Sequence, residues 1–142
     1  MDTKQTKQCT SCYCLKVRKA NGAVTKFYDT ILAPSGVTTR QYSLLLNISR
    51  AENISIRELA DMTELDRSTL ARNLKPLFNK ELVSDAREIG TRDCKLILTE
   101  KGKTVLSEAA ALWVKAQQML MEKVGYENLD MLDNVLEMLE KL

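Results

Sequence analysis

The stretch ELDRSTLARNLKPLFNKELV, residues 64–83, combines an apolar stripe with a cationic outer face. Apolar residues recur in it at the spacing of one face of an α-helix: Leu70, Leu74, Leu77 and Phe78. Asp66 stands before them, where its carboxylate can cap the first turn. Between Asp66 and Glu81 there is no acidic side chain, and the basic ones are Arg67, Arg72, Lys75 and Lys80. The stretch predicts a short helix whose outer face either meets an anionic partner or is simply solvated.

Pro76 lies inside this predicted helix. Proline lacks a backbone donor, and it disfavours helical geometry at the residue before it. We therefore expect a kink or an early end of the helix near Lys75.

The segment before this helix predicts a second, shorter one. Ser55 and Glu58 have the spacing of a capping box, in which each side chain bonds the free backbone amide of the other residue. They open a helix from Ile56 to about Met62. Residues 63–66 then form a tight link to the cationic helix.

The segment after the cationic helix predicts a β-hairpin. Residues 84–89 and 94–99 have the composition of two short strands around a tip that contains Gly90, with Cys94, Leu96 and Leu98 on one face. Two helices joined by a tight turn and followed by a hairpin form a winged helix-turn-helix, whose second helix enters the DNA major groove. Residues 38–99 are the predicted DNA-binding lobe.

Longer helical patterns flank this lobe. Residues 14–32 and 38–50 predict two helices separated by APSGV at 33–37, and Thr99 can cap a long helix to about Val124. A final amphipathic helix begins near Leu129. The long helix has two neighbouring apolar stripes: Val105, Ala109, Leu112, Ala116 and Met119 in one, and Leu106, Ala110, Trp113 and Leu120 in the other. One stripe is enough to pack on a domain, so the second indicates burial against another chain.

Composition and charge limit the classes of protein to which this chain can belong. The chain of 142 residues is expected to be a single domain, mainly α-helical with a small β-hairpin wing. It has no apolar run of membrane length and no signal-peptide pattern, so we expect a cytoplasmic protein without a membrane partner. Residues 67–103 carry nine basic and five acidic side chains, a net charge of +4. With no histidine and no phosphate-binding glycine loop, we expect neither an enzyme nor a cofactor.

The arrangement resembles the MarR family of bacterial transcriptional regulators. SIRELADMTELDRSTLARNLKPLFNKELV is similar to the family's helix-turn-helix, LILTEKG to the end of its wing, and FYDTILAPSGVTTRQYSLLLNI to its entry segment. The resemblance implies a homodimer, joined through residues 12–33 and 100–142, that binds a pseudo-palindromic operator in double-stranded DNA. It also implies repression as the usual mode of action.

The candidate DNA-binding residues fall in two groups. On the cationic helix, the side-chain types suited to bases and phosphates belong to Arg67, Ser68, Thr69, Arg72, Asn73 and Lys75. On the hairpin, the resemblance implies that Arg92 enters the minor groove, with Arg87 or Lys95 sharing this role. The family usually has an acidic residue two positions before this arginine to hold the tip. Gly90 occupies that position here.

The chain has four cysteines, Cys9, Cys12, Cys14 and Cys94. Without histidine they do not form the usual four-ligand zinc set, so no metal site is expected. The resemblance to organic-hydroperoxide-responsive members of the family implies that Cys14 is a reactive thiol paired with Tyr28 across the dimer, although Thr39 and Arg18 stand where those sensors have aromatic residues. A cysteine near a helix N-terminus and beside basic residues is chemically suited to this role. The alternative is an inert, buried Cys14.

Two further alternatives remain open from the sequence. A small apolar or phenolic effector could bind in the crevice between the dimerisation helices and the DNA-binding lobe, with Tyr28, Tyr42 and Trp113 as candidate linings. A thiol enzyme that consumes peroxide through Cys14 is a minor possibility from another functional class. Such an enzyme would turn over repeatedly, whereas a sensor reacts about once per site.

Overall fold

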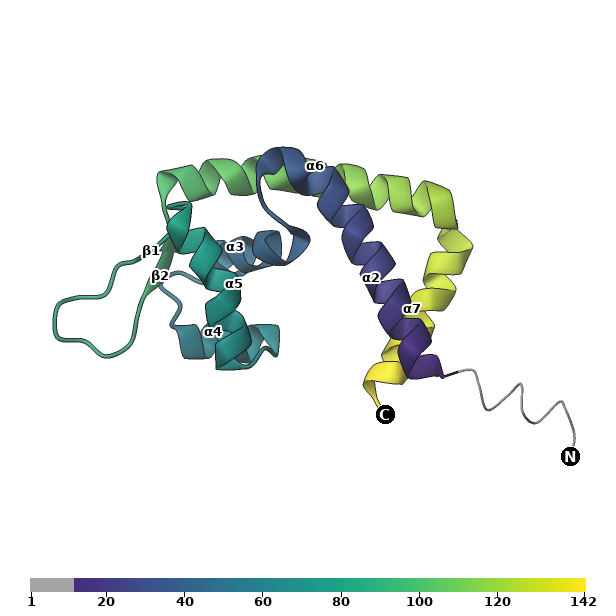
Figure 1. Ribbon diagram of the computed structural model, residues 1–142, viewed down its shortest axis with the longest axis horizontal. Helices are drawn as coiled ribbons and strands as arrows, with labels where there is room; N and C mark the ends of the chain where they lie inside the picture. The colour runs from purple at the N-terminus through teal and green to yellow at the C-terminus, as the bar shows by residue number, and fades with distance from the viewer. Residues whose placement is uncertain (1–11) are drawn as a thin grey trace, which may run out of the picture.

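The computed structural model describes residues 12–142 as a mainly helical chain with one β-hairpin (Figure 1). The elements, in order, are α2 (Tyr13–Leu32), the 3-10 turn η1 (Ala33–Ser35), α3 (Thr39–Arg50), α4 (Ile56–Thr63), α5 (Arg67–Asn79), β1 (Val83–Asp85), β2 (Leu96–Leu98), α6 (Glu100–Val124) and α7 (Tyr126–Glu140). The predicted fold class is confirmed. Within this described part, no helix combines the length and the apolarity needed to cross a membrane.

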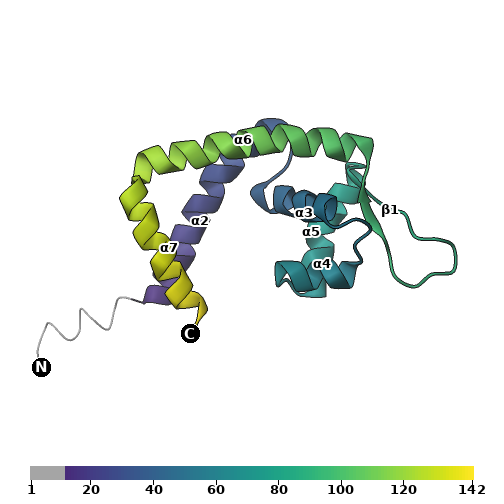
Figure 2. The same cartoon turned by 180° about the vertical axis from the view of Figure 1, so that it is seen from behind.

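The long helix α6 connects the two ends of the molecule. Its N-terminal half covers α3, α5 and the hairpin, with α4 farther from it (Figures 1 and 2). The helix α2 packs against α6 and extends away from it, as α7 does from the C-terminal end of α6. The loop between the two strands projects beyond the helices at the opposite end (Figure 1).

The core lies among α3, α4, α5, the hairpin and the first half of α6. Ten large apolar side chains in it are fully buried: Leu32, Leu44, Leu45, Ile54, Leu59, Leu70, Leu74, Leu77, Leu82 and Leu96. Three of them, Leu70, Leu74 and Leu77, belong to the predicted stripe of α5, but its fourth member, Phe78, is exposed. Burying one leucine side chain contributes about 1.5–3 kcal/mol, so this stripe fixes which face of α5 turns outward.

Side-chain caps begin α4, α5 and α6 at the predicted Ser55, Asp66 and Thr99, but the capping boxes differ from the expectation. The Ser55 hydroxyl accepts the N–H of Glu58 at 3.1 Å, and the reciprocal bond from the Glu58 side chain is absent from the described structure. A complete box occurs at α3 instead. There Thr38 accepts the N–H of Gln41, and the Gln41 side chain accepts the N–H of Thr38 at 3.0 Å. This Thr-x-x-Gln spacing was visible in the sequence.

The helix α5 continues through Pro76 to Asn79, so of the two expected effects of the proline, a kink or an early end near Lys75, the early end is wrong and the kink stays a prediction. Leu74 and Leu77, on either side of the proline, are both buried. The N–H of Lys80 bonds the carbonyl of Pro76 at 3.0 Å, which closes the last turn. Burial of the leucines outweighs the loss of one backbone hydrogen bond at the proline.

The hairpin strands are shorter than the expected 84–89 and 94–99. They pair antiparallel, with Val83 opposite Leu98 and Asp85 opposite Leu96. The N–H of Leu96 also bonds the carbonyl of Ile54 at 2.8 Å, which joins the hairpin to the segment before α4. Leu96 and Leu98 are buried and Cys94 is half-buried, in line with the predicted shared face.

Glycine is required where α6 meets the hairpin. A Cβ atom added at Gly102 would overlap the backbone carbonyl of Leu82. The N–H of Thr99 bonds that same carbonyl at 3.1 Å, and the Thr99 hydroxyl caps α6 by accepting the N–H of Gly102 at 2.9 Å. The glycine in LILTEKG therefore permits the close approach of α6 to the backbone.

We expect Gly102→Ala to lower the free energy of unfolding by about 1–3 kcal/mol, because the methyl group forces α6 away from Leu82. Gly22→Ala is the matched control. Gly22 lies in α2 with no atom within 4 Å of an added Cβ, so this substitution should raise stability by about 0.5–1 kcal/mol. Urea unfolding followed by circular dichroism compares the two variants. Equal effects on stability contradict the close-approach explanation.

Candidate nucleic-acid interface

The N-terminus of α5 is organised by Asp66. One of its carboxylate oxygens accepts the N–H of Thr69 at 2.7 Å and the hydroxyl of Ser68 at 2.7 Å, and the other accepts the Thr69 hydroxyl at 3.1 Å. The backbone bond from Thr69, followed by the two hydroxyls, holds the pKa of Asp66 below its ordinary value of 3.8. The cap therefore fixes the start of α5 and both hydroxyl side chains.

The outer face of α5 has the composition predicted from the sequence. Its exposed residues include Arg67, Ser68, Arg72 and Lys75. Thr69 and Asn73 are half-buried, and the Asn73 amide nitrogen is covered and has no hydrogen-bond partner in the described structure. The Arg72 guanidinium donates to the Thr69 hydroxyl at 3.4 Å. The helix thus presents three exposed cations outside its buried leucine stripe.

The hairpin brings further cations to the same region. Arg87, Arg92 and Lys95 are all exposed. Arg87 is also engaged within the hairpin, since its Nε lies 3.0 Å from a carboxylate oxygen of Asp85 and its other nitrogen donates to the carbonyl of Arg92 at 3.1 Å. No such bond of the Arg92 or Lys95 side chain is present in the described structure.

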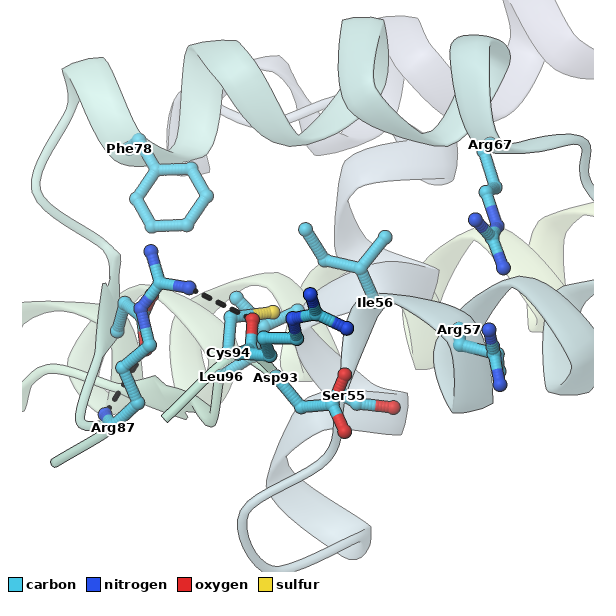
Figure 3. Close-up of a pocket in the computed structure, with 11 residues that line it drawn as sticks. Ser55, Ile56, Arg57, Arg67, Phe78, Arg87, Asp93, Cys94 and Leu96 are labelled. Atoms are coloured by element: carbon cyan, nitrogen blue, oxygen red, sulfur yellow. Dashed lines mark hydrogen bonds and ion pairs between the residues drawn. The ribbon is translucent and has the colours of Figure 1, made fainter. Parts of the chain in front are cut away.

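A groove of about 300 Å³ lies between the N-terminus of α4, the helix α5 from Arg67 to Phe78, and the hairpin (Figure 3). Its charged lining consists of four arginines and two aspartates: Arg57, Arg67, Arg87, Arg92, Asp85 and Asp93. Ile56, Phe78 and Leu96 supply apolar surface, and the half-buried Cys94 lies among them. Because guanidinium groups bind phosphate through paired N–H donors, the groove is suited to a phosphodiester backbone.

Arg57 is the one arginine of the groove that the sequence analysis did not select. It lies in the first turn of α4, directly after the Ser55 cap, and is exposed. The sequence could have indicated Arg57 through its position, because it lies at the N-terminus of a capped helix that precedes the cationic helix. Phe78, the last apolar residue of the α5 pattern, also lines the groove and is partly exposed to solvent.

Comparison with known proteins agrees with this geometry. Residues 35–89 match the model of the MarR family. M. tuberculosis transcriptional regulator MosR is 30% identical, with a TM-score of 0.73 over 93% of this chain and 98% of MosR. The chain belongs to the MarR family. The structure of MosR in complex with DNA is also similar, with a TM-score of 0.76 and 30% identity over 92% of this chain and 97% of that one.

Two further relatives of the MarR-family chain are more distant or match over a shorter segment. The HTH-type transcriptional regulator SarZ of Staphylococcus aureus is 33% identical over 93 residues, which are 65% of this chain. This match spans 63% of the length of SarZ. The repressor CouR bound to a 23-mer DNA duplex has a TM-score of 0.81 over 94% of this chain and 95% of CouR, and at 24% identity it shows a shared fold.

The structure places the two candidate sensor residues of this MarR-family chain far apart. Cys14 is exposed in the first turn of α2, whereas Tyr28 is buried and lies 14 residues later, about 21 Å along the helix. The Tyr28 hydroxyl donates to the Gln117 side chain of α6, and burial raises the pKa of the phenol. A contact between Cys14 and Tyr28 therefore requires a second chain. Cys9 lies outside the described residues, and Cys12 is exposed beside Cys14.

The candidate ligand residues lie in the core instead of lining an open crevice. Tyr42 is buried and stacks on Trp113, with ring centroids 6.2 Å apart and planes inclined by 28°. A crevice of about 460 Å³ does lie between α2, α3 and the end of α4, but neither aromatic residue lines it. Its lining is mostly hydrogen-bonding: Asn21, Thr25, Thr39, Arg40, Ser43, Leu44, Asn47, Met62, Thr63 and Leu65.

The Asp66 cap predicts a pH dependence. We expect Asp66→Ala to lower the melting temperature at pH 7, and the difference from wild type to begin to decrease as the pH falls below about 4. A carboxyl group whose pKa is lower in the folded state stabilises fully above its unfolded-state pKa, and this contribution is lost as the pH falls through the folded-state value.

Thermal unfolding between pH 3 and pH 7 measures this difference. The matched control is Asp61→Ala, which removes an exposed carboxylate of α4 that makes no side-chain hydrogen bond in the described structure. Its effect should stay small throughout this range. A difference between wild type and Asp66→Ala that does not decrease at all towards the acidic end of this range contradicts the capping role.

Proposed function

We propose that the protein is a dimeric DNA-binding transcriptional regulator that acts as a repressor. The observation that carries this proposal is that arginines from three elements line one groove: Arg57 of α4, Arg67 of α5, and Arg87 and Arg92 of the hairpin loop (Figure 3). The α5 side chains would enter the major groove, and Arg92 at the wing would reach the adjacent minor groove. The similarity to MosR in complex with DNA supports this assignment.

The dimer is proposed from apolar surface that the single chain leaves uncovered. In α7 the exposed apolar residues are Tyr126, Met131, Leu132, Val135, Leu136, Met138 and Leu139, and in α2 they are Tyr13, Leu15, Val17 and Val24. An amphipathic helix whose apolar face meets water needs a partner, and continuous patches of this kind mark protein interfaces. A second copy would cover both helices and place two recognition helices on half-sites about one DNA turn apart.

The proposal predicts specific, salt-dependent binding to DNA from around the protein's own gene. Arg72→Ala should weaken this binding and reduce the slope of log affinity against log salt by about one, because one phosphate contact is lost. Lys101→Ala, which removes an exposed charge at the start of α6, is the control and should leave the slope unchanged. Fluorescence anisotropy at two or more salt concentrations measures both. Binding that does not discriminate between operator and unrelated DNA counts against the regulator.

We propose that an effector releases the DNA, and two chemistries are supported. In the first, the Cys14 thiolate attacks a hydroperoxide oxygen, the O–O bond breaks, and an alcohol leaves while the sulfur becomes a sulfenic acid. The exposure of Cys14 at the start of α2 supports access of the peroxide. Cys12 is the nearest described thiol that could then condense with the sulfenic acid.

The second chemistry is binding of a small molecule in the crevice between α2, α3 and α4. The Thr39 hydroxyl, which lies in this lining, is buried without a hydrogen-bond partner in the described structure. Together with Arg40, Ser43 and Asn47 it favours a ligand with hydrogen-bonding groups over the apolar ligand expected from the aromatic residues. The cysteines would then be inert.

One equivalent of an organic hydroperoxide, added to the protein–DNA complex, separates the two chemistries. If Cys14 is the sensor, peroxide should abolish binding in wild type and leave Cys14→Ser bound, while Cys94→Ser behaves like wild type. Binding that survives peroxide in wild type contradicts the thiol switch and directs attention to the crevice. Consumption of many equivalents of peroxide per chain in the presence of a reductant would instead identify a thiol enzyme.

A further inference from the structure

A single carboxylate holds the base of the loop between the strands. One oxygen of Asp85 accepts the N–H of Arg87 at 3.0 Å and the N–H of Lys95 at 3.0 Å. The other oxygen lies 3.0 Å from Nε of Arg87. Because Arg87 is on the outgoing side of the loop and Lys95 on the returning side, Asp85 ties the two sides together.

Arg87 extends this connection towards the tip. Its guanidinium donates to the backbone carbonyl of Arg92 at 3.1 Å (Figure 3). A continuous path of hydrogen bonds therefore runs from the end of β1 through Asp85 and Arg87 to the backbone of Arg92. The tip itself is a turn in which Thr91 bonds the carbonyl of Glu88, and Gly90 has a φ of 93°.

Apolar packing does not hold this loop in place. Residues 85–93 are all exposed, and Ile89, the large apolar residue of the tip, is fully open to solvent. Apart from the Asp85–Arg87 path, the described link across the loop is the bond from the N–H of Ala86 to the carbonyl of Lys95 at 2.8 Å. The position of Arg92 thus depends on polar contacts near the base of the hairpin.

We propose that Asp85 and Arg87 are positioning residues that hold the wing in the conformation in which Arg92 meets DNA. This inference rests on the proposed function, in which Arg92 is a DNA contact. Ordering a loop upon binding costs conformational entropy, and a loop that is already ordered avoids this cost. Arg87, expected from the sequence to share the contact with DNA, acts through Arg92 instead.

Because Asp85 carries a negative charge, a positioning role and simple charge repulsion predict opposite changes in DNA affinity when Asp85 is removed. The side chain of Asp85 is only 25% exposed, and this desolvation alone would raise the pKa of its carboxyl group. The N–H groups of Arg87 and Lys95 and the Arg87 guanidinium instead hold the pKa below its ordinary value of 3.8. Asp85 is therefore ionised at neutral pH, and it lies on a surface proposed to face phosphates. By charge repulsion alone, its removal should strengthen DNA binding. A positioning role predicts the opposite.

The test compares Asp85→Ala with Asp93→Ala on operator DNA. Both variants remove one carboxylate from the lining of the same groove, but only Asp85 carries the described hydrogen bonds. We expect about three- to tenfold weaker binding for Asp85→Ala, the equivalent of ordering one or two side chains. Asp93→Ala should bind equally well or more tightly. Asp85→Asn, which keeps an acceptor for the two N–H groups, should restore part of the loss.

A double-mutant cycle shows whether Asp85 acts through Arg92. In an Arg92→Ala background, Asp85→Ala should cause no further loss, whereas independent contacts give additive losses. Arg87→Ala should match Asp85→Ala in affinity and leave the salt slope unchanged. A salt slope reduced by about one would identify Arg87 as a phosphate contact and overturn its positioning role.

Hydrogen exchange on the free protein tests the hairpin without DNA. The amide protons of Arg87 and Lys95 should exchange faster in Asp85→Ala than in wild type or in Asp93→Ala, with the melting temperature confirming an intact fold. Three results would each overturn the inference even if the wild type binds its operator: unchanged hydrogen exchange in Asp85→Ala, tighter DNA binding by Asp85→Ala, or additive losses in the double-mutant cycle. If the wild type does not prefer operator DNA, the proposed function itself is overturned. The exchange measurement still shows whether Asp85 orders the hairpin, because it needs no DNA.

Discussion

The contact between the start of α6 and the backbone of Leu82 determines how the rest of the molecule is arranged. The N–H of Leu82 bonds the carbonyl of Leu77 in the last turn of α5, and its own carbonyl receives the N–H of Thr99. The Thr99 hydroxyl also donates to the carbonyl of Glu81 at 2.6 Å. The end of α5, the base of the hairpin and the start of α6 therefore meet at one residue, and the absence of a side chain at Gly102 lets them meet so closely.

This junction ties the DNA-facing helix to the helices that would form a dimer. The helix α6 is 25 residues long, about 37 Å, and it packs against α2 and α3 before it leads to α7. A change in the packing of α2 on α6 would thus be transmitted through contiguous helices to the position of α5. Tyr28 and Gln117 form one polar contact of the α2–α6 interface, whereas Cys14 lies at the end of α2 remote from it.

Many local features could be predicted from the sequence because neighbouring residues cause them. Asp66 and Ser55 cap their helices, and Thr99 caps α6, since each lies immediately before an apolar pattern of helical period. The three leucines of the α5 stripe are buried as expected, and Arg67, Arg72 and Lys75 lie outside, whereas Phe78 of the same predicted stripe is exposed. The effect of Pro76 was not predictable in this way, because the burial of Leu77 by other elements decides whether the helix continues.

The sequence by itself determined the helices, their caps and the charge of the recognition face, since these depend on residues within a few turns of one another. Tertiary structure alone decided which distant groups meet. It brought Arg57 and Arg92 into the lining of one groove, put Tyr42 against Trp113 in the core instead of a ligand crevice, and joined Asp85 to Lys95 across the loop. These contacts depend on how the chain packs in three dimensions, because residues separated by many positions are brought together only when the core closes.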